Sequence, residues 1–401
     1  MKKHLVLITG RYFPTPSPTG KCAHAYINLL KKDYDVEVIC VSSGEREPYE
    51  WGDEKIHPIG NSGFFFRRWA ERKFRSSAVN TVLKLPGVLI RPFTHPKIFG
   101  WFGKMAWKRL EEIHRRNPVD LVFSACGPVA AHAAALRFKN NHPEVRWLAY
   151  TVDSYAAQQN GAMAKKSAMR YERKLLSGAD RILLSQEIFD SMETLRSDFE
   201  GKCSPLPYLM PERQESETKT VLPENGKINL VYVGRFYKKL RRPEFLLETA
   251  EKLGDKYVLN LFSGGACADV VKKIADRANG RIIIHPWASP EEINAVYAQA
   301  DILVNVGNSV PEFKPSKLFE YISTGKPIIN FYYPGLIDDE LAKNPLALQV
   351  EMIGNPSDNT EKIRRFIDEV CGKKLSEKEI EEIYRRHSKE YISEILYECA
   401  E

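Results

Sequence analysis

The stretch at residues 300–330, ADILVNVGNSVPEFKPSKLFEYISTGKPIIN, decides the fold. Its apolar run at 302–306 is typical of a strand that is buried on both faces of a parallel sheet. Pro315 and Ser316 are helix start signals, and the GKP triplet at 325–327 is a stop signal, so we expect a helix of about nine residues between them. The stretch therefore predicts a strand, a loop, a helix and a second strand.

A carboxylate on this helix has a place that suggests ligand binding. Leu318 and Ile322 are four residues apart and form one apolar face. Glu320 lies on another face, above Ser316 and Lys317, because residues three and four apart share a side of a helix. The free N–H groups and the dipole of the helix N-terminus favour an anion such as phosphate, and Lys317 adds a cation. A surface acid that merely pairs with a lysine is the alternative explanation.

Glu312, FKPSKLF, Glu320 and the following YISTGKPII resemble a known signature. It is the E-x7-E signature of the retaining, nucleotide-sugar-dependent glycosyltransferases of family four, which have the GT-B fold. The resemblance covers most of residues 228–335 and, more weakly, the N-terminal half. It implies that Glu320 holds the ribose hydroxyls of the donor nucleotide and that Glu312 faces the donor sugar. It also implies that the loop after Glu312 lines the donor site, with Pro315, Ser316 and Lys317.

The turn after the first predicted strand of the C-terminal half gathers cations. Its sequence is GRFYKKLRRPEF, at residues 234–245. Guanidinium groups bind phosphate oxygens through paired hydrogen bonds, so such a turn suits a diphosphate. A basic surface loop is the alternative. The resemblance assigns the donor diphosphate to the arginine after Gly234 and to a basic residue five or six positions on, which Arg235 and Arg241 match best, with Lys239 in reserve.

Length and composition indicate two domains in a reducing compartment. The chain has 401 residues, of which 43% are hydrophobic, and this fits two domains of about 200 residues each. Seven cysteines occur singly, which suggests neither a zinc site nor a disulfide framework. The apolar run in MKKHLVLITG is too short for a signal peptide, and no run approaches the roughly 18 residues of a spanning helix. We therefore expect a cytoplasmic protein.

The chain divides at a polar segment rich in proline. We predict an N-terminal Rossmann-like acceptor domain at 1–207, a linker at 208–227 and a C-terminal Rossmann-like donor domain at 228–379. Regular alternation of strands and helices predicts a parallel, doubly wound sheet in each domain, within the α/β class. The resemblance to GT-B proteins implies that the two domains face a cleft and that residues 380–401 cross back to the first domain as a glutamate-rich helix.

The N-terminal half offers two candidate positions. The loop GRYFPTPSPTGK lacks the G-x-G-x-x-G pattern of dinucleotide-binding proteins, which disfavours a nicotinamide-dependent oxidoreductase. Thr19 and Gly20 open the next helix instead, and the resemblance places Gly20 near the donor phosphate. Asp153 follows the predicted strand 145–150, and ligands of open α/β sheets bind at such carboxyl ends, although an aspartate there can also cap a helix. The resemblance favours the acceptor side for Asp153.

Residues 64–109 suggest a partner outside the protein. Between Arg67 and Arg116 there are thirteen lysines or arginines against three acids, interleaved with aromatic residues, in a chain of net charge +7. Basic segments with Trp and Phe can lie on an anionic membrane surface. A solvated helix face with a buried aromatic side is the alternative, and nucleic acid is disfavoured because no nucleic-acid-binding module accompanies the segment.

The sequence as a whole predicts a retaining glycosyltransferase. It would move a sugar, as a hexosyltransferase, from a nucleoside-diphosphate sugar to a glycan or lipid-linked acceptor in polysaccharide biosynthesis, as a peripheral protein on the inner face of the membrane. No DxD motif is found, and the protein cations would serve the diphosphate, so we expect no metal and no further cofactor. The alternatives are the oxidoreductase and a non-catalytic protein that binds a sugar nucleotide or lipid. The predicted catalytic residues are Asp153, Glu312, Arg235 and Arg241.

Overall fold

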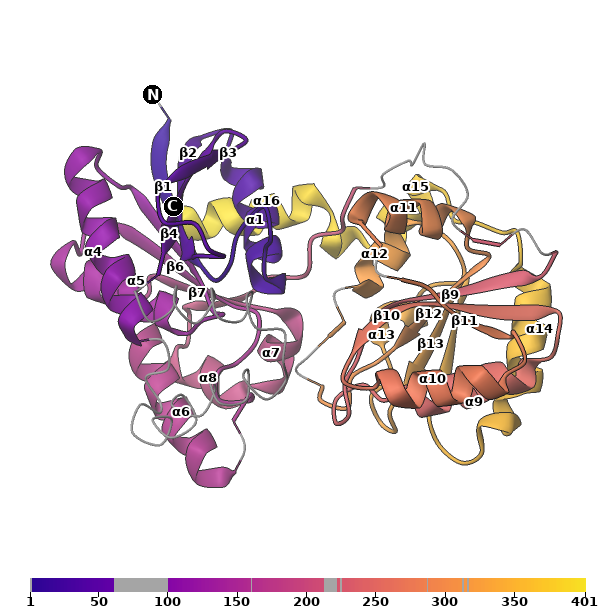
Figure 1. Cartoon of the computed structure of the whole chain (residues 1–401). Helices are drawn as coiled ribbons and strands as arrows, with labels where there is room; N and C mark the ends of the chain where they lie inside the picture. The colour runs from indigo at the N-terminus through magenta and orange to yellow at the C-terminus, as the bar shows by residue number, and fades with distance from the viewer. Residues whose placement is uncertain are drawn as a thin grey trace. The chain divides into compact units, whose positions relative to one another are not determined.

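The computed structural model describes residues 2–60, 100–159, 161–212, 222–223, 226–286, 288–311, 314–315 and 317–401. The chain forms two compact units. The first comprises Met1–Leu209 with Lys389–Glu401, and the second comprises Met210–Ser388. Each unit is an open, mainly parallel sheet with helices on both faces (Figure 1). The predicted α/β class with two doubly wound parallel sheets is therefore confirmed.

The sheet of the first unit has the order β3-β4-β2-β1-β5-β6-β7-β8. Its neighbouring strands pair in parallel except in the β3–β4 hairpin. This hairpin has no counterpart among the predicted strands, because its sequence, YEWGDEKIHPI, lacks a sustained apolar run. The strands are β1 (Lys3–Thr9), β2 (Tyr34–Val41), β3 (Tyr49–Trp51), β4 (Glu54–Ile59), β5 (Leu121–Ala125), β6 (Arg146–Thr151), β7 (Arg181–Leu184) and β8 (Cys203–Pro205).

Helices cover both faces of this sheet, and each face has its own core. Side chains alternate along a strand, so Leu5 and Leu7 of β1 pack into a core with α1 and α16, whereas Val6 and Ile8 pack into a core with α4 and α5. The last helix of the chain therefore belongs to the first unit. The helices are α1 (Pro18–Leu30), α4 (Gly100–Arg116), α5 (Ala130–Asn141), α6 (Ala162–Leu176), α7 (Gln186–Ser191), α8 (Glu193–Asp198) and α16 (Lys389–Ala400).

The sheet of the second unit is parallel throughout and has the order β11-β10-β9-β12-β13-β14. The strand predicted at 302–306 is β12 with the same bounds. The edge strand β14 has no predicted counterpart, because its run ALQVE alternates too briefly to stand out. The strands are β9 (Ile228–Phe236), β10 (Tyr257–Gly265), β11 (Ile282–Ile284), β12 (Ile302–Val306), β13 (Ile328–Tyr332) and β14 (Ala347–Glu351).

Helices of the second unit again lie on both faces of the sheet (Figure 1). The predicted capping box is confirmed: the Glu292 backbone N–H donates to Ser289 Oγ at 3.2 Å, and the Glu292 carboxylate accepts from the Ser289 N–H at 2.6 Å. The α-helices are α9 (Glu244–Leu253), α10 (Ala268–Arg277), α11 (Pro290–Gln299), α12 (Lys317–Ser323), α13 (Asp339–Ala342), α14 (Thr360–Val370) and α15 (Glu377–Ile383). The described residues of this unit also form the 3-10 helices η1 (Pro356–Asn359) and η2 (Arg385–His387).

The glutamate-rich segment at the end of the chain is not one helix, and this part of the prediction is wrong. The chain leaves α15, turns through η2 and begins α16 only at Lys389. The buried His387 ring packs against Phe319 with 4.6 Å between ring centroids, and Ser388 is extended. The packing of His387 against α12 therefore interrupts the helical pattern.

The basic and aromatic segment at 64–109 falls partly outside the described residues, which resume at 100. In α4 the aromatic side chains face the core: Phe102 is fully buried, and Trp101 and Trp107 pack partly buried against it. Lys104 and Lys108 are exposed on the other side. In this helix the cationic side is therefore exposed and the aromatic side is largely buried. None of the described helices is long and apolar enough to cross a bilayer.

Candidate functional site

The cations after the first strand of the second unit do not all lie in a turn. We predicted that this strand ends before Gly234, but β9 continues through Phe236, and Arg235 pairs in register with Gly264 of β10. The reason is that pairing with β10 carries the strand through Gly234, a residue type that is depleted in strands. Arg235 is an exposed strand residue, whereas Lys239 and Arg241 lie in the β9–α9 loop.

Arg241 is the most firmly positioned of these cations. Its Nε donates to Asn308 Oδ1 at 3.0 Å. Its backbone pairs with Tyr237 in both directions, which closes the β9–α9 loop. Ser309 connects the β12–α12 loop to the β9–α9 loop. Its N–H donates to Leu240 O at 2.8 Å, and its Oγ donates to the carbonyl oxygen of Lys239. The guanidinium is therefore held between the two loops that follow the central strands of the sheet.

A glycine makes room for the Arg241 guanidinium. A Cβ atom at Gly234 would lie 3.7 Å from Arg241 Nη1 and 3.2 Å from Tyr232 Oη. The Tyr232 and Phe236 rings stack at 4.4 Å, so both lie on the face of β9 that Gly234 shares. Burial raises the pKa of Tyr232 to about 12, although Arg241 acts against the shift. Arg235 starts from the opposite face of the strand, so the structure brings Arg241, and not Arg235, beside Gly234.

Glu320 projects from α12 into a polar contact with two other side chains. Its Oε2 accepts from Lys317 Nζ at 2.5 Å and from Tyr297 Oη at 3.1 Å. The Lys317 ammonium also lies 5.8 Å from the centre of the Tyr297 ring. The predicted apolar face is confirmed, because Leu318 and Ile322 are buried. The helix has seven residues instead of about nine, since it begins at Lys317.

The loop between the two glutamates is only partly described. Glu312 and Ser316, both predicted donor-site residues, lie outside the described residues. Pro315 is buried, and its carbonyl accepts from the Leu318 N–H at 3.0 Å, which starts the helix. Lys314 Nζ lies 3.2 Å from Asp338 Oδ2, with both side chains largely buried. This ion pair anchors the loop to the N-terminus of α13.

Asp153 lies just beyond the carboxyl end of β6, as the prediction required. Burial, and secondarily the charge of Glu187, raises its pKa to about 6. Within the described part of the chain, no hydrogen bond to the Asp153 carboxylate is found. The alternative in which Asp153 caps a helix does not hold, because α6 begins at Ala162 after Gly161. The carboxyl group is available to exchange a proton near neutral pH.

A second carboxylate holds the loop that carries Asp153. Glu172 on α6 is 1% exposed and accepts from Ser154 Oγ at 2.9 Å, from the Tyr155 N–H at 3.0 Å and from the Ala156 N–H at 3.3 Å. These donors belong to the three residues that follow Asp153 in sequence. Glu172 is not among the residues predicted from the sequence, because a single glutamate between basic residues of a helix gives no sign that it is buried.

Gly20 has a structural explanation of its own. It lies buried in the first turn of α1, where a Cβ atom would be 2.3 Å from Arg11 O. Its N–H donates to Ser17 Oγ, which caps the helix. Any side chain would push the β1–α1 loop away from α1. Gly20 therefore serves the packing of this loop within the first unit.

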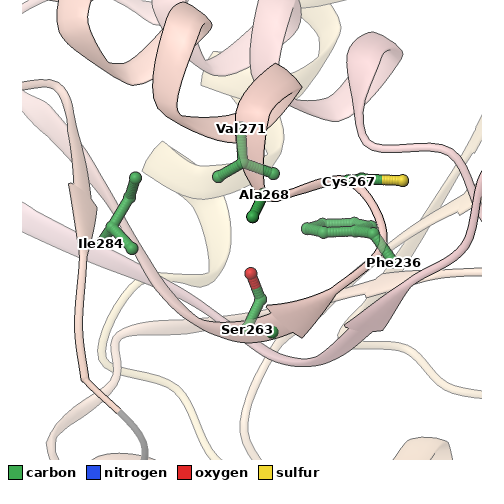
Figure 2. A pocket seen from close by; sticks show the side chains of 7 residues that line it. Phe236, Ser263, Cys267, Ala268, Val271 and Ile284 are labelled. Atoms are coloured by element: carbon green, nitrogen blue, oxygen red, sulfur yellow. The ribbon is translucent and has the colours of Figure 1, made fainter. Parts of the chain in front are cut away.

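A small cavity lies at the carboxyl ends of three strands in the second unit (Figure 2). Its volume is about 60 Å³. Side chains enter it from β9, β10 and β11 on one side and from the start of α10 on the other, and most of them are apolar. Carboxyl ends of parallel strands are the usual ligand-binding edge of such sheets. The lining residues are Phe236, Ser263, Gly264, Cys267, Ala268, Val271 and Ile284.

Among the described residues, one group has ligand atoms close enough together, within 4.8 Å of one another, to hold a metal ion. His114, His142 and Glu144 lie at the carboxyl ends of α4 and α5 and just beyond. However, His114 Nδ1 accepts the Val119 N–H at 3.0 Å, so the neutral ring carries its proton on Nε2 and offers no second lone pair. Helices run opposite to the strands they connect, so this group lies at the other edge of the sheet from Asp153. It has no part in the candidate site.

Comparisons with known proteins identify the second unit. Residues 227–369 match the family of group 1 glycosyl transferases. These residues include Gly234, Arg241 and Glu320. No curated protein sequence matches the chain.

Solved structures resemble the whole chain in fold. Sucrose-phosphate synthase from Thermosynechococcus elongatus is 12% identical with a TM-score of 0.69, over 99% of this chain and 98% of that one. The UDP-forming α,α-trehalose-phosphate synthase from Burkholderia xenovorans is 12% identical with a TM-score of 0.66, over 100% and 99%. The lipopolysaccharide outer core galactosyltransferase WaaB is 14% identical with a TM-score of 0.59, over 99% and 98%. The second unit thus carries a match to the group 1 glycosyl transferases over residues 227–369, and the chain as a whole has the GT-B fold.

Proposed function

We propose that the protein is a retaining hexosyltransferase that uses a nucleoside-diphosphate sugar. The observation that carries the proposal is the Arg241 guanidinium, which Asn308 fixes beside Gly234 at the carboxyl edge of the sheet. Cleavage of the anomeric C–O bond leaves negative charge on the departing diphosphate while the sugar becomes oxocarbenium-like. A cation that is already in position stabilises this charge without reorganisation of the site.

The other candidate residues take distinct roles in this proposal. Glu320 binds the ribose hydroxyls, and Glu312 faces the sugar. Arg235 and Lys239 add positive charge near the diphosphate. In the first unit, Asp153 accepts a hydrogen bond from the acceptor hydroxyl. We propose that the acceptor is a glycan or a lipid-linked intermediate of polysaccharide biosynthesis at the inner face of the membrane.

A metal ion has no assigned role in this reaction, because Arg241 and its neighbouring cations serve the diphosphate. EDTA should therefore leave the rate of transfer unchanged. Loss of activity with EDTA and recovery with Mg²⁺ or Mn²⁺ would overturn this part of the proposal.

The donor can be found by a screen of nucleotide sugars. UDP-sugars come first, since the Burkholderia xenovorans enzyme above is named as UDP-forming; GDP- and ADP-sugars follow. A ligand at 100 times its dissociation constant stabilises the folded state by about 2.7 kcal/mol, which a thermal shift detects. We expect one nucleotide series to stabilise the protein and its sugar to be released or transferred. Stabilisation without turnover would favour the non-catalytic alternative, and no stabilisation by any nucleotide sugar would refute the proposed donor.

A further inference from the structure

The helices α4, α5 and α6 form one layer on a single face of the first unit, and we propose that this basic layer docks on an anionic lipid bilayer. The proposal rests on the proposed function only for the idea that the acceptor lies at a membrane. The three helices follow one another in the sequence, separated by strands of the sheet, and pack side by side, α4 against α5 and α5 against α6 (Figure 1). Their outward surface is therefore a product of the fold.

The outer side of α6 carries cations and no acid. Met163, Lys166, Arg170 and Lys174 follow one another at spacings of three and four residues, so they form one stripe along the helix. All four are exposed, and Met163 is 88% exposed at the start of the helix. The only acid of α6 is Glu172, which faces inward and holds the Asp153 loop.

These cations have no partner within the part of the chain that the structure describes. Lys166, Arg170 and Lys174 make neither an ion pair nor a side-chain hydrogen bond there. Some exposed cations of other helices are paired: on α10, Lys272 lies 2.8 Å from Asp276, and on α14 an arginine pairs with a glutamate one turn away. The α6 stripe therefore adds only repulsion to the folded state, and its charge is available to an outside anion.

The neighbouring helices extend the same charge across the face. Lys104 and Lys108 of α4 are exposed and have no ion-pair partner among the described residues. Arg137 of α5 lies over the Trp107 ring, 3.9 Å from its centre. On the opposite face of the unit, α16 exposes glutamates along its length.

A lipid surface fits this layer better than a nucleic acid does. The aromatic residues of α4 pack against the core, and Arg137 covers the Trp107 ring, so these rings are poorly placed for bases to stack on. A row of cations beside one exposed apolar side chain suits the headgroup layer of a membrane, where Met163 can enter the interface. Attraction of this kind depends on anionic lipid and weakens as salt screens it.

Vesicle sedimentation tests the proposal with the full chain. The vesicles are phosphatidylcholine alone, or phosphatidylcholine with phosphatidylglycerol. The variant reverses the stripe with Lys166→Glu, Arg170→Glu and Lys174→Glu. The matched control makes the same change of net charge on the second unit with Lys273→Glu, Lys373→Glu and Lys378→Glu, which are also exposed. We expect wild type and control to bind only the anionic vesicles, and the stripe variant to bind them at least about tenfold more weakly.

The outcomes separate this surface from the proposed enzyme activity. Equal binding of the stripe variant and the control, or no preference of wild type for anionic lipid, would overturn the proposal. Binding of single-stranded RNA by a protein that does not bind either kind of vesicle would also overturn the proposal and would point to nucleic acid. Thermal unfolding and nucleotide binding should be the same in both variants, because the stripe is exposed. If wild type transfers no sugar but the stripe variant still loses vesicle binding, the surface stands and the proposed function fails.

Discussion

Glu320 and Glu312 differ in what they should do for the donor. On α12, Glu320 is held by Lys317 of the same helix and by Tyr297 of α11. In this position its carboxylate can accept hydrogen bonds from a ribose. A charged hydrogen bond is typically worth about 1.5–3 kcal/mol, so Glu320→Ala should lower the affinity for free nucleotide roughly tenfold to a hundredfold. Glu312→Ala should leave nucleotide affinity nearly unchanged and lower turnover, as expected for a contact used in the transition state.

Calorimetry with free nucleotide on both variants, followed by turnover on the identified donor, tests this difference. Glu291→Ala, an exposed glutamate on α11, is the matched control for Glu320→Ala. The same nucleotide affinity for wild type and Glu320→Ala would refute the placement of the donor.

Two adjacent arginines allow a test of the cation at the diphosphate. Arg241 is fixed by Asn308, whereas the Arg242 side chain is 60% exposed and pairs with Glu244. Loss of a positioned donor to a developing negative charge typically costs about a hundredfold or more in rate, so Arg241→Ala should lower kcat/KM by that order. Arg242→Ala should change it little. Steady-state kinetics on both variants decides the matter, and similar losses would mean that Arg241 has no special role.

The β6–α6 loop shows how one buried side chain can place a functional element. Glu172→Gln keeps the size of the side chain but turns one acceptor into a donor that faces backbone N–H groups. We expect kcat to fall while the KM for the donor stays the same, because the donor residues lie in the other unit. If Asp153 acts as a base with a pKa of about 6, activity falls as pH drops through that value, and Glu172→Gln should shift this limb of the pH profile.

Ser154→Ala removes only one of the hydrogen bonds to Glu172 and serves as the milder variant. A lower melting temperature with an unchanged pH profile in both variants would reduce Glu172 to a purely structural role.

Strands β1, β2 and β4 share a titratable cluster that should make stability depend on pH. Glu37 lies 2.6 Å from His57, 2.7 Å from Arg116 and 3.5 Å from His4 Nε2, while His4 Nδ1 faces two backbone carbonyls. Burial opposes the charged form of His4, but Glu37 and these carbonyls outweigh it and raise the pKa of His4 above 6.5. At Glu37, burial favours the neutral form, but the hydrogen bonds from His4, His57 and Arg116 outweigh it and hold the pKa of Glu37 well below 4.5.

The sign of each shift sets the pH window. The contribution of His4 to the free energy of unfolding is fully present below pH 6.5 and is lost as pH rises through its raised pKa. The contribution of Glu37 is present above pH 4.5 and is lost as pH falls through its lowered pKa. The difference in melting temperature between wild type and His4→Gln should therefore be largest between pH 4.5 and 6.5 and should shrink as pH rises through the raised pKa of His4. A difference that grows with pH would contradict this assignment.

The sequence indicates which elements exist better than it indicates where they end. Buried runs such as 302–306 identify the central strands, since only a strand covered on both faces is apolar throughout. The end of β9 could not be predicted, because Arg235 is in the strand only through its pairing with β10. Within the site, the sequence locates Arg241 and Glu320 through their motifs. Asn308 and Tyr297, which contact them, could not be found, because such contacts depend on the packing of loops and helices.

At the scale of the molecule, the last helix is part of the first unit. Leu396 of α16 is fully buried in the core with Leu5 and Leu7. Leu396→Ala should therefore lower the free energy of unfolding of the first unit by about 2–5 kcal/mol. Nucleotide binding in the second unit should be unaffected, although that unit immediately precedes α16 in sequence. Urea unfolding measures the first effect and calorimetry the second. Glu394→Ala, at an exposed position of α16, is the control, and equal stability of the two variants would contradict the assignment.

The return of α16 also sets an order of events during protein synthesis. Tyr397 Oη donates to Asp33 Oδ2 at 2.6 Å across 364 residues, so this contact must wait for nearly the whole chain. A ribosome adds about 5–20 residues per second, and the intervening second unit therefore delays completion of the first by roughly ten to forty seconds. During that time the nascent first unit exposes the apolar surface that α16 later covers. Translation that stops before Lys389 would release a complete second unit attached to an unfinished first unit, a natural substrate for chaperones.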